Sequence, residues 1–99
     1  MIRHTVAFTL RHDPDSAAEH AFLADGERIL TGIPGVLDFA ASRQVSPKSD
    51  YRFQFAMTFA DQAAYDAYNA HPDHVAFVEQ RWAVEVAEFE ELDFEPLGA

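Results

Sequence analysis

Two histidines, His4 and His74, and a tyrosine, Tyr68, are the residues of this sequence best suited to acid–base chemistry. An imidazole titrates near pH ~6.5, so modest changes in its surroundings let it accept or release a proton at neutral pH. Pro72 is expected to open a helix whose first turn holds His74, and a helix N-terminus disfavours the imidazolium, although Asp73 acts in the opposite direction. His74 should therefore tend toward the neutral form that serves as a general base.

Together the three side chains suit the abstraction of a proton next to a carbonyl group. His74 would take the proton, Tyr68 would donate a hydrogen bond to the developing oxyanion, and His4 would orient the substrate or pair with His74. Phe77 and Val75, apolar residues of the same helix, are the predicted substrate-binding residues. The structural alternative is that the histidines and the tyrosine are hydrogen-bonded core residues, which is common for these residue types.

A metal site is an alternative use of His71 and His74, which are three residues apart with Asp73 between them. Zinc needs three or four convergent ligands, and this spacing straddles a proline at a helix start, so we expect no metal. We also expect no cofactor, because the sequence has no glycine loop for phosphate and no dinucleotide fingerprint. The acids near the C-terminus are predicted to form a solvated edge: Glu85, Glu88, Glu90, Glu91, Asp93 and Glu95.

The elements that must position these residues follow from hydrophobic periodicity. Alternation predicts strands over residues 2–10, 36–45, 51–59 and 88–95, and the 3.6-residue period predicts helices over 16–32, 61–70 and 72–86. His4 falls on the apolar face of the first strand, which the helix bearing His74 must cover, so both imidazoles would line one cavity. Gly26 lies in the apolar stripe of the first helix, where either another group approaches closely or a loss of about 1 kcal/mol in helix propensity is simply tolerated, and we favour the second interpretation.

The order of these elements predicts an α+β, ferredoxin-like fold: a four-stranded antiparallel sheet with helices on one face, in a single domain over residues 1–99. The opposite face of the first and third strands carries small and polar residues. Such a face can pack on a second copy of itself. We therefore expect a homodimer in which two sheets form an α/β barrel.

Composition narrows the partners. Seventeen Asp and Glu residues against seven Lys and Arg give a formal charge of −10, which repels phosphate backbones and argues against nucleic acid. The sequence has no apolar run long enough to span a membrane, no leader pattern and no cysteine. We expect a cytoplasmic protein with a small-molecule ligand and no membrane partner.

Three segments resemble the stress-responsive dimeric A/B barrel (Dabb) family: Met1-Ile2-Arg3-His4-Thr5-Val6, Ile33-Pro34-Gly35-Val36, and Tyr68 to Phe77 with its His-Pro-Asp-His-Val-Ala-Phe run. The resemblance spans nearly the whole chain and implies the ferredoxin-like fold and the homodimeric barrel. In plant polyketide cyclases of this family a tyrosine and the second histidine of the run act in an intramolecular aldol condensation, with the first-strand histidine also in the pocket. The matching positions here are Tyr68, His74 and His4.

The sequence thus favours a dimeric Dabb protein that binds a small, largely apolar carbonyl compound and uses His74 as a general base in a lyase, cyclase or isomerase reaction. One alternative is a non-enzymatic stress-response or ligand-binding homodimer, in which His4 and His74 are structural. Another is an oxygenase of the related dimeric barrel type that acts on a quinol or haem, for which the sequence has no motif.

Overall fold

The computed structural model describes residues 1–98 of the chain. Its elements in chain order are β1 (Ile2–Leu10), α1 (Ala17–Thr31), β2 (Leu37–Arg43), β3 (Phe53–Phe59), α2 (Gln62–Ala70), α3 (Pro72–Phe77), the π-helical segment η1 (Val78–Trp82), α4 (Ala83–Glu85) and β4 (Val86–Phe94). The predicted strands and helices are all present, with bounds that shift by at most two residues. None of the helices within residues 1–98 has the length and apolar character needed to cross a bilayer.

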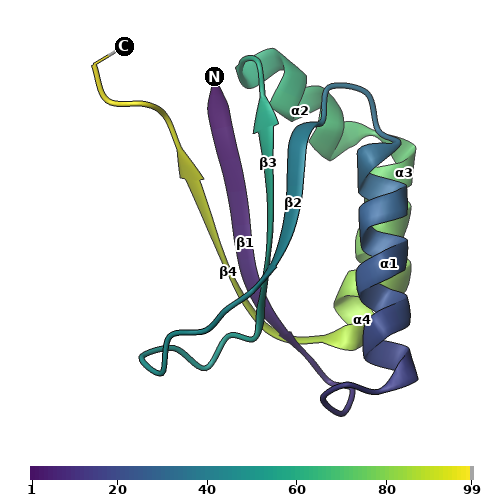
Figure 1. Ribbon diagram of the computed structural model, residues 1–99. Coiled ribbons are helices and arrows are strands. Elements are labelled where there is room, and N and C mark those ends of the chain that lie inside the picture. The colour runs from purple at the N-terminus through teal and green to yellow at the C-terminus, as the bar shows by residue number, and fades with distance from the viewer. Residues whose placement is uncertain (99) are drawn as a thin grey trace.

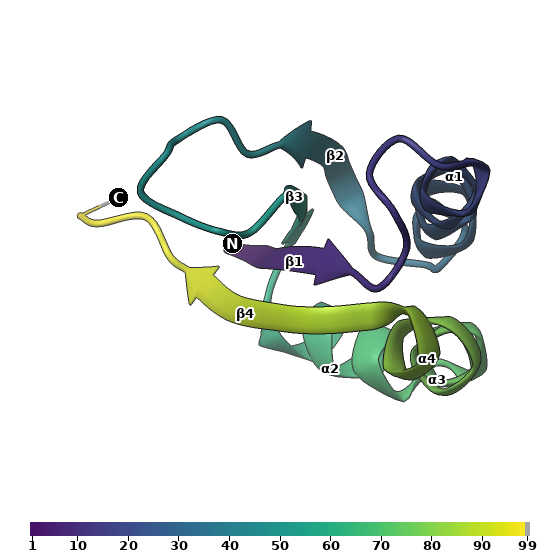
Figure 2. The ribbon, with the colours of Figure 1, turned by 90° about the horizontal axis from the view of Figure 1, so that it is seen from below.

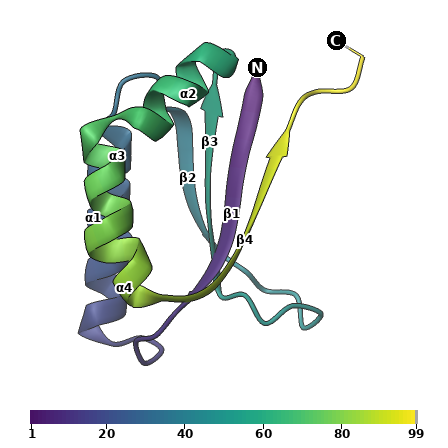
Figure 3. The same ribbon diagram turned by 180° about the vertical axis from the view of Figure 1, so that it is seen from behind.

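The strands form one four-stranded antiparallel sheet in the order β2-β3-β1-β4. All helices lie on the same face of this sheet, and the other face is open (Figures 1 and 2). The loop between β2 and β3 and residues 95–98 after β4 extend away from the helical layer (Figure 3). This arrangement confirms the ferredoxin-like α+β fold with the helices on one side.

The core fills the space between the sheet and the helices. Alternate residues of β1 and β3 point into it, since side chains on a strand alternate between its two faces. α1 contributes Phe22 and Leu30, α2 contributes Tyr68, and α3 contributes Phe77. The fully or nearly fully buried apolar side chains include Val6, Phe8, Leu10, Phe22, Leu30, Phe53, Phe55, Met57, Phe59, Tyr68, Phe77 and Val86.

Gly26 marks a close approach of α1 to the sheet, which corrects the interpretation of this glycine as a tolerated cost. A Cβ atom at this position would lie 2.9 Å from both Cε2 and Cζ of Phe55, and 3.5 Å from Cζ of Phe77. Carbon atoms pack at about 3.5–4.0 Å, so a side chain here would displace the Phe55 ring. The helix can pack this close only because residue 26 has no side chain.

The segment that follows α2 starts as predicted but does not stay α-helical. His71 caps it, its Nδ1 accepting a hydrogen bond from the backbone N–H of Asp73 at 3.1 Å, and Pro72 occupies the first turn. The sequence predicts one α-helix up to about residue 86, whereas the chain widens into the π-helical turn η1 between α3 and α4. Such turns contain one extra residue per turn and occur often at functional sites.

The register of β4 decides which of its acidic residues face the helices. β4 pairs with β1 in a register that places Asp93 opposite His4 and Glu91 opposite Val6. Residues directly opposite in an antiparallel pair share a face, so Glu91 and Asp93 lie on the helical side of the sheet. Leu92 consequently lies on the open face. β4 is an edge strand whose acids are exposed, as the prediction of a solvated edge requires, but Glu91 and Asp93 face the helices and not the open side.

Candidate active site between sheet and helices

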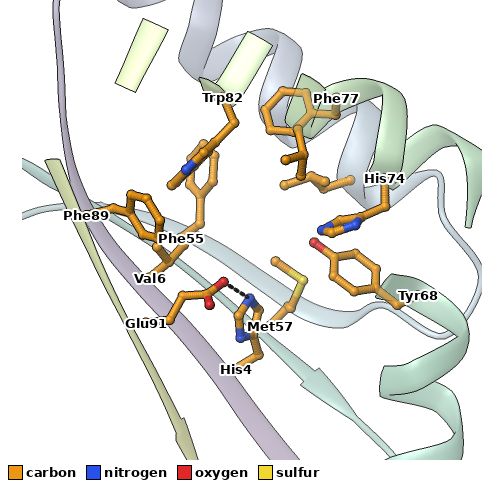
Figure 4. Close-up of a pocket in the computed structure, with 12 residues that line it drawn as sticks. His4, Val6, Phe55, Met57, Tyr68, His74, Phe77, Trp82, Phe89 and Glu91 are labelled. Carbon is orange, nitrogen blue, oxygen red and sulfur yellow. Dashed lines mark ion pairs between the residues drawn. The ribbon is translucent and has the colours of Figure 1, made fainter. Parts of the chain in front are cut away.

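A cavity of about 260 Å³ lies between the sheet and the helices. Its lining comes from β1, β3 and β4 on one side and from α1, α2, α3 and η1 on the other (Figure 4). Most of the lining is apolar, and a few polar groups converge on the space, which is the usual composition of a small-molecule site. The lining residues are His4, Val6, Leu30, Phe55, Met57, Tyr68, His74, Phe77, Val78, Trp82, Phe89 and Glu91.

His4, on β1, is held by a hydrogen-bond network with β4 and α2. Its Nδ1 lies 2.6 Å from Oδ1 of Asp93 and 2.9 Å from the hydroxyl of Tyr65, which also donates to Oδ2 of Asp93 at 2.9 Å. An ionised carboxylate only accepts hydrogen bonds, so the His4 Nδ1–H donates to Asp93. The other nitrogen, Nε2, is then directed toward the cavity, where Oε1 of Glu91 lies 4.0 Å away (Figure 4).

His74, on α3, has one ring nitrogen engaged by the backbone. Its Nδ1 lies 3.3 Å from the carbonyl oxygen of Asn69, and because a carbonyl only accepts, Nδ1 carries the hydrogen. Burial lowers the pKa of His74 below its usual value and nearby His4 adds to this effect, while the Asn69 hydrogen bond and Glu91 oppose it. The neutral imidazole is thus favoured, with its Nε2 lone pair available to accept a proton.

Tyr68, on α2, stands beside His74 in the cavity wall (Figure 4). The two ring centroids are 4.4 Å apart, and the ring of His4 lies 6.3 Å from that of Tyr68. Burial raises the pKa of the Tyr68 phenol well above its usual value, and the hydroxyl of Tyr65 and the carboxylate of Glu91 add to the shift. The hydroxyl therefore stays protonated at neutral pH and remains a hydrogen-bond donor.

Four of the five predicted site residues line this cavity: His4, Tyr68, His74 and Phe77. The fifth, Val75, does not line it and is 41% exposed. The next residue along a helix points about 100° away from its predecessor, so Val75 cannot share the face of His74. Val78, four residues after His74, lies on that face and lines the cavity instead.

Three polar residues of the site were missed from the sequence: Glu91, which lines the cavity, and Tyr65 and Asp93, which hold the ring of His4. The direction of these side chains depends on how β4 pairs with β1 and on how α2 is rotated about its axis, and the sequence pattern determines neither. The available signal was the alternation of β4, since Phe89, Glu91 and Asp93 necessarily share a face. The alternation shows that these three residues lie on the same face of β4, but it does not show that this is the face that carries His4 on β1.

In the part of the chain that the structure describes, neither His71 nor His74 belongs to a group of three side chains that could hold a metal ion. Within residues 1–98, the one group of three metal-type side chains with convergent ligand atoms is Asp15, Glu19 and His20. Glu19 already accepts hydrogen bonds from Nε of Arg52 at 3.0 Å and from the backbone N–H of Asp15 at 2.9 Å. These contacts explain the cluster as an ion pair at the start of α1.

Comparisons with known proteins agree with this fold. A family model described as the stress-responsive A/B barrel domain, Dabb, matches residues 2–96. A crystal structure of a Dabb family protein with a ferredoxin-like fold from Mesorhizobium loti is 59% identical, with 98% of this chain and 97% of that chain covered and a TM-score of 0.97. No match was found among curated proteins.

More distant solved structures share the fold. A hydroxynitrile lyase from Passiflora edulis is 14% identical, with 99% of this chain and 94% of that chain covered and a TM-score of 0.83. A dimeric ferredoxin-like protein from Thermobifida fusca is 21% identical, with 96% and 90% covered and a TM-score of 0.76. The family model and the Mesorhizobium structure together cover nearly the whole chain. This protein belongs to the stress-responsive A/B barrel (Dabb) family.

Proposed function

We propose that this protein binds a small, largely apolar carbonyl compound in the cavity and abstracts a proton next to the carbonyl group, with His74 as the general base. The observation that carries the proposal is the state of His74. Its Nδ1–H donates a hydrogen bond to the carbonyl oxygen of Asn69, and burial favours the neutral ring by lowering its pKa, so Nε2 is the nitrogen that can accept a proton. The apolar walls favour an uncharged, compact ligand.

The reaction step follows from the groups around that nitrogen. The carbon–hydrogen bond next to the carbonyl breaks, the proton passes to Nε2 of His74, and the electron pair moves onto the carbonyl oxygen as an enolate. The protonated hydroxyl of Tyr68 donates a hydrogen bond to that oxygen. Return of the proton at another atom gives an isomerase, attack of the enolate on a second carbonyl gives a cyclase, and loss of a leaving group gives a lyase.

His4 has a supporting role in this proposal. Asp93 and Tyr65 hold its ring, so its Nε2 is presented to the cavity in one orientation. There it can bind a polar group of the ligand. Holding a substrate atom within hydrogen-bond reach of His74 is what converts a neutral imidazole into an effective base.

The test is hydrogen–deuterium exchange at the carbon next to a carbonyl. A panel of small aryl and cyclic ketones is first screened by thermal shift, and those that bind are incubated with the protein in D₂O and followed by proton NMR. We expect His74→Gln to slow exchange by about 10²–10⁴-fold, the usual contribution of a general base. His20→Gln, which changes an exposed histidine of α1, is the matched control and should leave the rate unchanged.

Equal exchange rates in His74→Gln and the unsubstituted protein would refute the assignment of the base. Ketones that bind tightly yet exchange no faster than in buffer would instead support the non-enzymatic ligand-binding alternative.

We also propose that the chain forms a homodimer through the open face of its sheet. Leu92 and Phe94 on β4 are 51% and 52% exposed, and both lie opposite residues of β1 on the side away from the helices. Covering such a face removes apolar surface from water. Light scattering after size exclusion should give twice the monomer mass. A Leu92→Glu, Phe94→Glu variant should be monomeric, whereas Val84→Glu, a control on the helical layer, should stay dimeric.

A further inference from the structure

Glu91 is a carboxylate in a cavity whose other walls are apolar or neutral. It lies opposite Val6 in the β1–β4 pairing and faces the helices, next to His4 (Figure 4). It is the only acidic residue among those that line the cavity in the described part of the chain, and no lysine or arginine lines it. Its side chain is 58% exposed, which places it at the mouth of the cavity.

The charges around the cavity therefore sum to a negative value. Glu91 and Asp93 lie on the two sides of the His4 ring, with Oε1 of Glu91 4.0 Å from Nε2 and Oδ1 of Asp93 2.6 Å from Nδ1. Even a protonated His4 balances only one of these two carboxylates, and His74 is neutral. A negatively charged ligand would meet repulsion there, and a positive one attraction.

We propose that Glu91 sets the charge of the ligand, so that the cavity accepts uncharged carbonyl compounds and compounds with a cationic group close to the carbonyl position, and discriminates against carboxylates. This inference rests on the proposed function, since it concerns the ligand of the same cavity. Because the side chain of Glu91 is partly in water, its effect is screened. We expect about tenfold discrimination rather than the several-hundredfold effect of a buried charge.

The test uses three probes of nearly the same shape and different charge: benzamidinium, benzamide and benzoate. Trp82 is the single tryptophan of the chain and lines the cavity, so its fluorescence reports binding at this place. Titrations at about 0.15 M ionic strength, where the Debye length is about 8 Å, keep distant surface charges from dominating. In the unsubstituted protein benzoate should bind about tenfold more weakly than benzamide, and benzamidinium at least as tightly as benzamide.

Glu91→Gln should change the ranking with little change in shape. Benzoate should gain about tenfold in affinity, benzamidinium should lose about tenfold, and benzamide should change by less than about twofold. Glu90→Gln is the matched control, because it removes the same charge from the next residue of β4. Glu90 lies opposite Ala7 on the other face of the sheet. This control should leave all three affinities unchanged.

Two results would overturn the role of Glu91. One is a benzoate affinity equal to that of benzamide in the unsubstituted protein, a measurement that needs no variant. The other is a response to Glu91→Gln no larger than the response to Glu90→Gln. If none of the three probes alters the fluorescence of Trp82, ligand binding in this cavity fails altogether, and the proposed function fails with it.

Discussion

Gly26→Ala tests the packing of α1 against the sheet. The higher helix propensity of alanine should raise the free energy of unfolding by about 1 kcal/mol. Its Cβ, however, would lie 2.9 Å from two ring atoms of Phe55, a fully buried residue, so the ring must move by about 0.6–1 Å to restore normal contact. Overpacking of this kind costs about 1–3 kcal/mol. Because two ring atoms are contacted, we use about 2 kcal/mol for this cost, so the free energy of unfolding should fall by about 1 kcal/mol in total.

The space around Phe55 explains why the strain is not relieved freely. Its ring centroid lies 4.8 Å from that of Phe8 and 5.3 Å from that of Phe39, so these neighbours oppose movement in two directions. The free direction is toward the cavity, which Phe55 lines. The substitution should therefore also weaken the binding of any ligand that fills the cavity.

Urea unfolding at one fixed protein concentration, followed by far-ultraviolet circular dichroism and by Trp82 fluorescence, measures the effect on the free energy of unfolding. Gly32→Ala is the matched control at the end of the same helix. Its Cβ would meet the nearest atom, the carbonyl oxygen of Ile29, at 3.4 Å, and we expect a change within about 0.5 kcal/mol. The same Gly26→Ala change in a Phe55→Leu background should be neutral or stabilising.

Equal stability of Gly26→Ala and the unsubstituted protein would show that α1 is not held against the ring of Phe55. The same conclusion would follow from an equal loss in the Phe55→Leu background, because a loss that does not depend on Phe55 cannot come from contact with its ring.

Three further predictions concern charge and hydrogen bonding. The lowered pKa of His74 means that between that pKa and about 6.5 the unfolded chain binds more protons than the folded one, so stability rises with pH in this window. His74→Gln should flatten that rise, and parallel stability–pH curves would contradict the assignment. Glu19→Gln leaves Arg52 without its buried partner and should cost about 2–4 kcal/mol in urea unfolding, against almost nothing for the exposed Glu27→Gln. Burial opposes ionisation of Glu19, but Arg52 lowers its pKa overall, so its stabilisation is present above about pH 4.5 and lost on acidification, a loss that Glu19→Gln should not show. Tyr68→Phe keeps the ring packing, so its free energy of unfolding should stay within about 1 kcal/mol of the unsubstituted protein, while hydrogen–deuterium exchange of the ketone should slow by about tenfold or more. A large loss of stability with an unchanged exchange rate would instead show that Tyr68 is only a core residue.

Most of the fold was predictable from local patterns. The strict alternation of β1 and β3 identifies their buried faces, and Ser16, Asp61 and Pro72 mark helix starts that the structure has at or within one residue of those positions. These signals are local, because they depend on backbone hydrogen bonding and on side-chain direction within one element. The extra residue of the π-helical turn was not predictable, since Trp82 adopts its place against Phe8 and Phe89 only in the packed core.

For the candidate site, too, some residues were predictable from local patterns and others only from the packed structure. The sequence by itself determined that His4 lies on the apolar face of a strand, that His74 lies in the first turn of a helix opened by Pro72 and that Tyr68 lies near the end of the preceding helix. Only the tertiary structure decided which residues complete the cavity. Each face of β4 carries both apolar and acidic residues: Leu92 lies on the face of Glu90, and Phe89 lies on the face of Glu91 and Asp93, so the pattern of β4 by itself does not say which face turns toward the helices. Pairing with β1 turned Asp93 toward His4 and Glu91 toward the cavity, because in an antiparallel sheet the partner strand sets which face a side chain shares.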